Sequence, residues 1–314
     1  MFRVSGVLVM EGPKAGRGSG VVAGARRPPA RVVPAPDAGL RGAPRMAAWR
    51  NPTFWLLALF AGLVAAATYG YVSAGWPAWA TVTVQAVAIY VGFTVLHESV
   101  HRLAHQNRVV NDVVGWITGL PLTVTQPTFR TVHLAHHAKT NEPDDDPDFV
   151  VGRGPWWLRP LSFVSPLWEY RIHYYGRRGW KNRAELVAQL GLDVVIVVGV
   201  AGAVVTGTFG DLAVLWIVPA LVAVAFLGFA FDYLPHRPQD STERYLDTRA
   251  YPSSVLNVVL LGQNYHLVHH AWVTVPWFRY QTAFEAARSD LDAVGARTTR
   301  GAHRRPLAGV SVTG

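Results

Sequence analysis

The stretch Gly262-Gln263-Asn264-Tyr265-His266-Leu267-Val268-His269-His270, near the C-terminal end, decides how this sequence is interpreted. Its three histidines have an HxxHH spacing, which places them within about one turn of a helix. Three further histidine groups precede it: His97, His101 and His105, then His133, His136 and His137, and then the single His236. Ten of the 12 histidines therefore fall into four groups, each close to a long apolar segment.

The apolar residues, 50% of the 314-residue chain, gather in four runs at about 53–73, 78–96, 186–205 and 212–231. A helix needs about 20 residues to cross the ~30 Å hydrocarbon layer of a membrane. Buried helices of soluble proteins are seldom as long or as free of charge as these runs. The sequence therefore predicts an all-α integral membrane protein with four transmembrane helices.

The basic residues predict how the chain is oriented. Lys and Arg are absent from the short connections 74–77 and 206–211 and are frequent near both ends and in the central segment. By the positive-inside rule both termini are expected in the cytoplasm, with the protein in the cell membrane. All four histidine groups then lie on the cytoplasmic side, in a histidine-rich helical cap. The net charge of +9 indicates contact with anionic membrane lipids and not with nucleic acid.

Three regions follow from composition. We expect residues 1–50, rich in Gly, Ala, Pro and Arg, to be a disordered basic arm, 51–284 to be the membrane domain, and 285–314 to be a basic tail. Translation from Met1 and from Met46 both remain open. Residues 109–129 are apolar but interrupted by glycines and prolines, which predicts a shallow re-entrant or interfacial pair.

The number of histidines indicates two metal ions, because eight or nine imidazoles exceed the roughly four to six ligands that one ion accepts. The chain has 0 cysteines, which excludes thiolate ligands and disulfides and leaves iron, zinc, copper or nickel as candidates. His97, His101 and His105 recur every four residues, so a continued helix would place them on one face. We expect His105 to stand beside the ligands or on the helix surface rather than to bind metal.

One motif supports a different function. His97-Glu98-Ser99-Val100-His101 matches the H-E-x-x-H pattern, in which two histidines hold zinc and the glutamate activates water. A membrane zinc metalloprotease is therefore an alternative, although it leaves the other histidine groups without a role. A membrane protein that binds metal without catalysis is a further alternative.

The order HxxxH, HxxHH and HxxHH, interleaved with four spans, resembles the membrane fatty acid desaturase and hydroxylase superfamily over about residues 53–280. Three segments resemble its desaturase-like β-carotene hydroxylases: residues 133–148, Phe231-Asp232-Tyr233-Leu234-Pro235-His236-Arg237-Pro238 and residues 262–270. Glu98 and Val273 depart from that pattern, where an aspartate and a proline are usual.

The resemblance implies a di-iron centre whose ligands are nine histidines: His97, His101, His133, His136, His137, His236, His266, His269 and His270. Asp232 and Asn264, with His105, are expected to contact the ligand imidazoles from outside. The acidic run Asp144–Asp148 is a further candidate for holding the outer ring nitrogens of the histidines, with a solvated loop as the alternative. The implied enzyme is a non-haem oxidoreductase of monooxygenase or desaturase type. It would use O2 as co-substrate, an external ferredoxin-like electron donor and a lipophilic substrate from the bilayer.

Hydroxylation of the β-ionone ring of a carotenoid is the leading reaction. Desaturation of an acyl-lipid or acyl-CoA is the alternative.

Overall fold

The computed structural model describes residues 32–44 and 46–299. Within this part of the chain helices dominate, and strands β1 (Arg249–Ala250) and β2 (Arg297–Thr298) form one short parallel pair. Among the described residues, four helices are long and apolar enough to cross a membrane: Pro52–Ser73, Ala78–Val100, Arg183–Thr206 and Phe209–His236. The predicted all-α fold with four spans is therefore confirmed.

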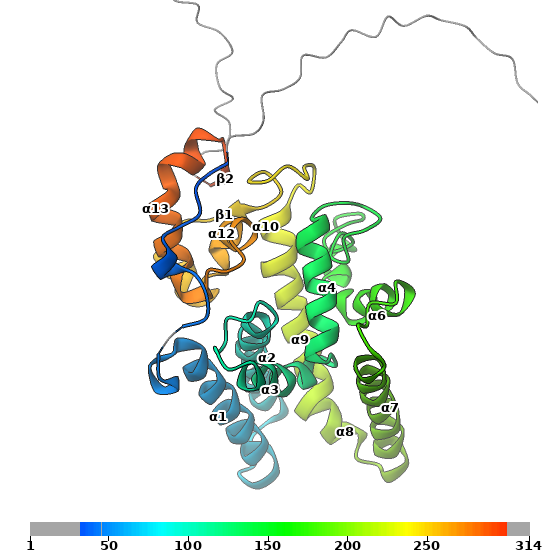
Figure 1. The fold of residues 1–314 in the computed structure, drawn as a ribbon. Coiled ribbons are helices and arrows are strands. Elements are labelled where there is room, and N and C mark those ends of the chain that lie inside the picture. The colour runs from blue at the N-terminus through cyan, green and yellow to red at the C-terminus, as the bar shows by residue number, and fades with distance from the viewer. Residues whose placement is uncertain (1–31, 45, 300–314) are drawn as a thin grey trace, which may run out of the picture. The chain divides into compact units, whose positions relative to one another are not determined.

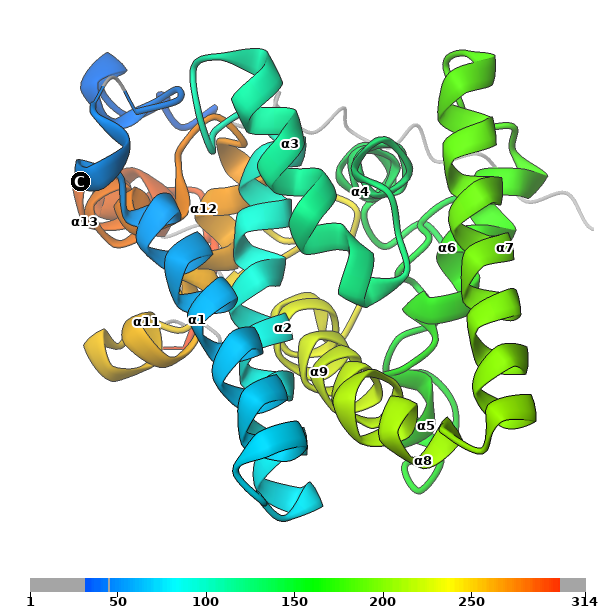
Figure 2. The same cartoon turned by 90° about the horizontal axis from the view of Figure 1, so that it is seen from below.

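The first two spans form an antiparallel pair, α1 (Pro52–Ser73) and α2 (Ala78–Val100), which lie side by side (Figures 1 and 2). The Asn51 side chain caps α1 by accepting a hydrogen bond from the Thr53 N–H at 3.0 Å. The chain reverses at Gly75, whose φ of +67° is readily adopted by glycine. Gly92 of α2 lies against the Phe60 ring, where a Cβ would come within 2.8 Å. This close packing fixes α2, which carries the first histidine.

The C-terminal end of α2 determines which histidines it can present. The helix extends four residues beyond the predicted 78–96 and therefore contains His97, with His101 as its C-cap. Arg102 has a φ of +62°, and the Leu103 N–H donates to the Glu98 carbonyl at 2.8 Å, which closes the helix. A helix continued through His105 would have placed it on the same face as His97 and His101, but this turn redirects the chain before His105.

Residues 109–129 form α3 (Arg108–Gly119), the 3-10 turn η3 (Leu120–Leu122) and the start of α4 (Gln126–Lys139). Val109, Val113 and Ile117 of α3 are 70%, 48% and 47% exposed, at the four-residue spacing of one helix face. Such a face is expected of a helix lying at the membrane surface. None of the four membrane-crossing helices found in the described chain lies in this segment, in keeping with the predicted shallow pair.

The central segment carries two short helices before the third span. These are α5 (Arg159–Ser162) and α6 (Pro166–Gly176), which precede α7 (Arg183–Thr206). Asp193 of α7 accepts hydrogen bonds from the Arg171 guanidinium at 2.8 Å, from the Gln189 amide at 3.0 Å and from the Tyr175 hydroxyl at 2.6 Å. The intramembrane carboxylate is thus fully paired, and it ties α7 to α6.

The fourth span is one long helix with two π-helical turns. Its parts are α8 (Phe209–Leu212), the π-helix η4 (Ala213–Ile217), α9 (Val218–Leu227), the π-helix η5 (Gly228–Tyr233) and α10 (Leu234–His236). This helix lies beside α2 in both views (Figures 1 and 2). It extends beyond the predicted 212–231 and ends on His236, so the span itself delivers the single histidine.

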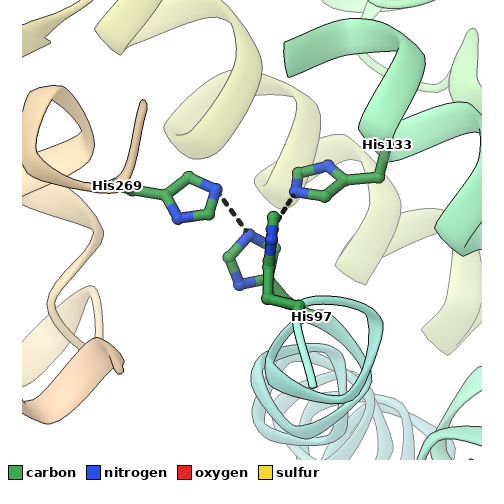
Figure 3. A group of neighbouring side chains, drawn as sticks. His97, His133 and His269 are labelled. Atoms are coloured by element: carbon green, nitrogen blue, oxygen red, sulfur yellow. Dashed lines mark hydrogen bonds between the residues drawn. The ribbon is translucent and has the colours of Figure 1, made fainter. Parts of the chain in front are cut away.

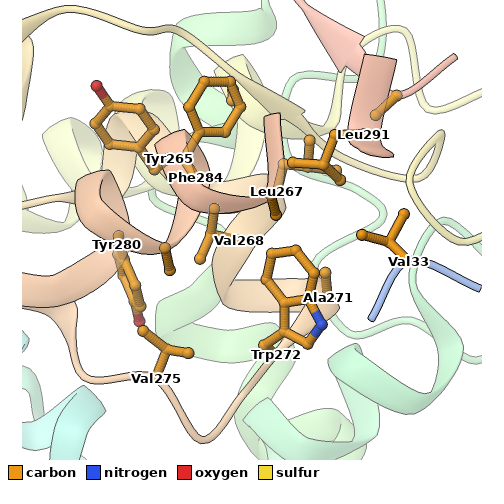
Figure 4. Packing of buried hydrophobic residues seen from close by; sticks show 14 of the residues in the cluster. Val33, Tyr265, Leu267, Val268, Ala271, Trp272, Val275, Tyr280, Phe284 and Leu291 are labelled. Carbon is orange, nitrogen blue, oxygen red and sulfur yellow. The ribbon is translucent and has the colours of Figure 1, made fainter. Parts of the chain in front are cut away.

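The remaining chain forms the helical cap. It contains β1, α11 (Ser254–Val259), the 3-10 turn η6 (Gln263–Tyr265), α12 (His266–Ala271), the 3-10 turn η7 (Trp277–Arg279), α13 (Tyr280–Ala293) and β2. Side chains of α12 and α13, including Leu267, Tyr280 and Phe284, pack into one buried cluster (Figure 4). The apolar side chains of the HxxHH stretch belong to this cluster, which fixes α12 in place.

The ends of the described chain also belong to this cluster. Val33 is 2% exposed and packs into it, and its N–H donates to the Tyr245 hydroxyl at 3.1 Å. The 3-10 turns η1 (Ala38–Leu40) and η2 (Ala48–Arg50) then lead into α1. At the other end the expected boundary at 284/285 falls inside α13, whose Ala287 and Leu291 are buried. Most of the expected arm, residues 1–31, and the end of the expected tail, residues 300–314, lie outside the described residues.

Candidate metal centre

The structure brings nine histidines from four helices together. His97 comes from α2 and His101 from its C-cap, His236 from α10, and the two HxxHH groups from α4 and α12. Figure 3 shows the rings of His97, His133 and His269 turned toward one another from three different elements. These nine are the residues that the family resemblance implied as ligands. Most are buried, and His101, His137 and His270 are partly exposed.

The first group contains His97, His101, His133 and His269, whose ring nitrogens all lie within 4.8 Å of one another. The Nε2 atoms of His97 and His269 are 3.0 Å apart, and those of His133 and His101 are 2.9 Å apart. The four rings therefore direct the same nitrogen toward one point.

The second group contains His136, His236, His266 and His270, with the same 4.8 Å limit between ring nitrogens. The Nε2 atom of His266 lies 3.1 Å from that of His236 and 3.1 Å from that of His270. His137 stands between the two groups: its Nε2 lies 3.0 Å from the Nε2 of His133, and it also groups with His269 and His270.

These contacts fit metal ions better than they fit hydrogen bonds. Nitrogens bound to one ion at about 2.0–2.1 Å are separated by about 2.9–3.4 Å, which is the range found here. A neutral imidazole carries one N–H, yet the Nε2 atoms of His133 and His266 each face two others. The buried Nε2 of His136 has no hydrogen-bond partner within the described chain. Nitrogen donors without sulfur suit iron as well as zinc.

In four of the histidines the Nδ1 atom, which is the ring nitrogen not directed at the cluster, contacts a polar group of the protein. Each of these contacts fixes the orientation of its imidazole ring. His136 Nδ1 lies 2.8 Å from Asp146 and 3.3 Å from Asp148. The Gln263 side-chain oxygen lies 3.1 Å from His266 Nδ1, and the Tyr280 hydroxyl lies 2.9 Å from His269 Nδ1. His270 Nδ1 lies 3.3 Å from the Thr140 hydroxyl.

The sequence identified only some of the polar residues that contact these Nδ1 atoms. The acidic run was a candidate for holding outer nitrogens, and two of its members do so. Gln263, Tyr280 and Thr140 were missed. Gln263 stands three residues before its partner His266, a spacing that a helical turn brings into contact, whereas Thr140 and its partner His270 are far apart in sequence. Tyr280 begins a separate helix, so no local spacing identifies it.

Burial keeps most of these imidazoles neutral, which is the form that binds metal. It lowers the pKa values of His101, His133, His137, His266, His269 and His270 well below the ordinary value, and neighbouring imidazoles lower them further. His136 is different: burial lowers its pKa, but Asp146 and Asp148 outweigh that effect and raise it to about 10. A metal ion bound to the Nε2 of His136 would replace the proton as the positive charge that Asp146 and Asp148 stabilise.

The three residues expected to contact the ligands from outside lie in different surroundings. His105 is outside both groups; its Nδ1 accepts the Asn107 N–H at 2.9 Å and its ring meets Phe54 edge-on. The Asn264 amide donates to the carbonyls of Tyr251 and Ser253, at 2.9 and 3.2 Å, and so fixes the loop before α12. Asp232 lies one turn before His236 and lines a cavity instead.

The geometry around Glu98 does not favour a zinc protease. Its carboxylate is buried and lies 3.9 Å from Nδ1 of His97, on the outer side of that ring. The Nε2 side, where a water-activating group would stand, is occupied by three further histidines. The H-E-x-x-H pattern therefore arises here from two members of a larger nitrogen cluster.

A mainly apolar cavity adjoins the histidines. Phe93 and Phe129, which line it, have ring centroids 5.9 Å from His97 and 5.3 Å from His133. Its wall combines α2, η3, α4, α6 and the fourth span. The cavity therefore lies beside the first histidine group.

Comparison with known proteins gives the family. The model of the family described as "Fatty acid desaturase" matches residues 73–301. Dihydrorhizobitoxine desaturase of Bradyrhizobium elkanii is 25% identical over 224 residues, 63% of this chain and 64% of that protein. A β-carotene ketolase of Paracoccus sp. (strain N81106 / MBIC 01143) is 32% identical over 154 residues, 47% of this chain and 53% of that protein.

An sn-1 acyl-lipid omega-3 desaturase (ferredoxin) of Synechocystis sp. (strain ATCC 27184 / PCC 6803 / Kazusa) is 24% identical over 243 residues, 66% of each chain. The matched part of this chain thus spans between about half and two thirds of these relatives' lengths. The family model covers most of the membrane domain, including all nine histidines. The predicted superfamily is confirmed, and the chain belongs to the fatty acid desaturase family.

Proposed function

We propose that this protein is an O2-dependent di-iron oxidoreductase of the membrane that acts on a C–H bond of a long apolar lipid. The observation that supports this most directly is the pair of four-imidazole groups with converging Nε2 atoms, bridged by His137. All nine histidines would hold the two irons. When bound, the irons would supply the reduction of O2 and the oxidation of the C–H bond, chemistry beyond any side chain.

The protein's own contribution would be to hold the ligands, exclude water and position the substrate. Asp146, Gln263 and Tyr280 fix ring orientation. The cavity beside Phe93 and Phe129 would align an apolar chain that enters from the bilayer. Whether hydroxylation or desaturation follows depends on the position of the reacting substrate carbon in the site, to within roughly an ångström.

Oxidation of the β-ionone ring of a carotenoid, with hydroxylation as the leading outcome, is the first candidate reaction. The segments at 231–238 and 262–270 support it, and β-carotene ketolases are among the relatives. Desaturation of an acyl lipid is the second candidate, supported by the oleoyl-lipid and omega-3 desaturases that match a similar share of the chain.

We further propose that an external donor such as a ferredoxin supplies the electrons from the cytoplasmic side, where both termini are expected. A relative that carries ferredoxin in its name supports this donor class. His101, His137 and His270 are the partly exposed ligands, so electrons would enter near them. The basic residues of the chain would attract an acidic carrier.

Expression of the full chain in a β-carotene-producing bacterial host tests the reaction. A pigment with oxidised rings supports the first candidate, and unchanged pigment with newly unsaturated acyl chains supports the second. His269→Ala serves as the inactive control. It should abolish turnover and leave membrane insertion intact, because His269 contributes to the first group but to none of the spans.

A further inference from the structure

One wall of the apolar cavity carries a carboxyl group that belongs to none of the candidate metal-binding groups of the described chain. Asp232 lines the cavity with Tyr170, and the other lining residues are apolar: Phe93, Leu96, Leu122, Val124, Phe129, Pro166, Leu167, Val224, Leu227 and Gly228. Asp232 belongs to the fourth span, where an ionisable side chain is costly and is usually functional.

Asp232 has no hydrogen-bond donor among the described residues. The charged groups that act on it most are Asp148, His136 and Asp146, and two of these are also acids. Asp193 of the third span, by contrast, accepts hydrogen bonds from Arg171, Tyr175 and Gln189. The fold therefore satisfies the carboxyl of Asp193 fully and leaves that of Asp232 open to the cavity.

The backbone around Asp232 is specialised for this position. Residues Gly228–Tyr233 form the π-helix η5, a turn type common at functional sites. At Gly228 the helix passes so close to α5 that a Cβ would lie 2.2 Å from the Phe163 carbonyl oxygen. Tyr170 of α6 lines the same cavity, so a carboxyl and a phenol hydroxyl stand in its otherwise apolar wall.

We infer that Asp232 and Tyr170, which line the same cavity, form a hydroxyl-binding end of it and hydrogen-bond to an alcohol group on the bound apolar chain. A carboxyl and a phenol hydroxyl in an otherwise apolar wall favour a ligand that carries a hydroxyl, because an unpaired carboxyl in such surroundings is costly. The inference rests on the proposed function for the identity of the chain as a lipid substrate or product.

Binding without turnover tests the inference. The purified full-length protein in lipid nanodiscs is titrated anaerobically, without reductant, with β-carotene and with its derivative that carries one hydroxyl on each ring. The wild type should bind the dihydroxylated probe about tenfold more tightly, which corresponds to about 1.4 kcal/mol. Equal affinities for the two probes would overturn the inference.

Variants show whether Asp232 causes the difference. Asp232→Leu should bind β-carotene as the wild type does and lose the preference for the hydroxylated probe. Asp232→Asn keeps an acceptor oxygen and should retain part of the preference. If Asp232→Leu no longer binds β-carotene, Asp232→Ala, which needs less room, is tested in its place. A leucine or alanine variant that keeps the full preference would contradict the inference.

Asp211→Leu is the matched control. It removes an acid from the opposite end of the same long helix, where the Tyr71 hydroxyl contacts Asp211 at 2.9 Å. It should leave both affinities unchanged, and an equal loss of preference there would attribute the effect to the helix rather than to the cavity.

The alcohol can be present in the substrate or be installed by the reaction, and turnover separates these sources. Oxidation of the dihydroxylated probe but not of β-carotene indicates a substrate hydroxyl. Conversion of β-carotene to an alcohol that Asp232→Leu makes less selectively indicates a product hydroxyl. Turnover of neither probe, with acyl lipids also unchanged, would remove the proposed function, whereas the binding preference would stand independently.

Discussion

At the scale of single residues, the ligand imidazoles make the metal-free protein sensitive to acid. A histidine whose pKa is depressed on folding takes up protons in the unfolded state first, so its stabilising contribution is lost as the pH falls below about 6.5. Six of the clustered histidines behave in this way: His101, His133, His137, His266, His269 and His270.

Three groups outside the spans act in the opposite direction. The pKa of His136, raised to about 10, that of Asp148, raised to about 6, and that of Asp247, which burial raises, give contributions that are lost as the pH rises. The six histidines outnumber these three groups, so the chelator-treated protein should unfold at a lower temperature at pH 5 than at pH 7.5, by up to about 1.4 kcal/mol per group and pH unit. Thermal unfolding in detergent measures this, and equal midpoints at both pH values would contradict it.

Asp146 provides a second prediction at this scale. Its carboxylate holds His136 Nδ1 at 2.8 Å and also accepts the N–H groups of Asn141 and Asp148. Asp146→Asn keeps a carbonyl oxygen but removes the charge, and it should weaken metal binding about 10–100-fold. Competition with a chelator measures the affinity. Asp145→Asn, a neighbouring acid paired with Arg177, should bind metal as the wild type does; an equal effect there would remove the role of Asp146.

At the scale of elements, apolar runs predicted the spans well because length and lack of charge are properties of each segment alone. Helix ends were less predictable. The turn at Arg102 that separates His105 from His101 depends on backbone hydrogen bonds that the four-residue spacing does not reveal. The π-helical turns of the fourth span cannot be recognised from its hydropathy. One of them, η5, carries Asp232.

The segment before α1 makes a testable contribution to the cap. Val33 is buried, the Gly42 N–H donates to the Thr274 carbonyl at 2.6 Å, and the Gln106 amide donates to the Pro44 carbonyl at 3.0 Å. A chain started at Met46 loses all three contacts and should be about 2–4 kcal/mol less stable. A chain started at Val32 keeps them and is the control. Equal thermal midpoints for the two would show that the segment contributes nothing.

At the scale of the whole molecule, the sequence indicated which histidines gather but not how their rings are held. The spacing within each HxxHH group is local, so it could be recognised. The partners Tyr280 and Asp146 reach the ligands through the packing of the cap and of the central segment, which depends on contacts distant in sequence. The cavity is likewise a joint product of five elements.

Membrane orientation is a prediction at this scale. The chain has 0 cysteines, so single cysteines can be introduced at Gly75, Thr208 and Arg178 and labelled in intact cells with an impermeant maleimide. The positive-inside rule predicts labelling at Gly75 and Thr208 and protection at Arg178. Labelling at Arg178 with protection at the other two would place the histidines on the outer face.

Metal content tests the central claim most directly. The full-length protein, purified anaerobically with iron supplied, should contain about two irons per chain, and His269→Ala should contain fewer. Mössbauer or X-ray absorption spectra should show iron ligated by imidazole nitrogen. A single zinc per chain, or iron that persists unchanged in His269→Ala, would contradict a two-iron centre built from the nine histidines.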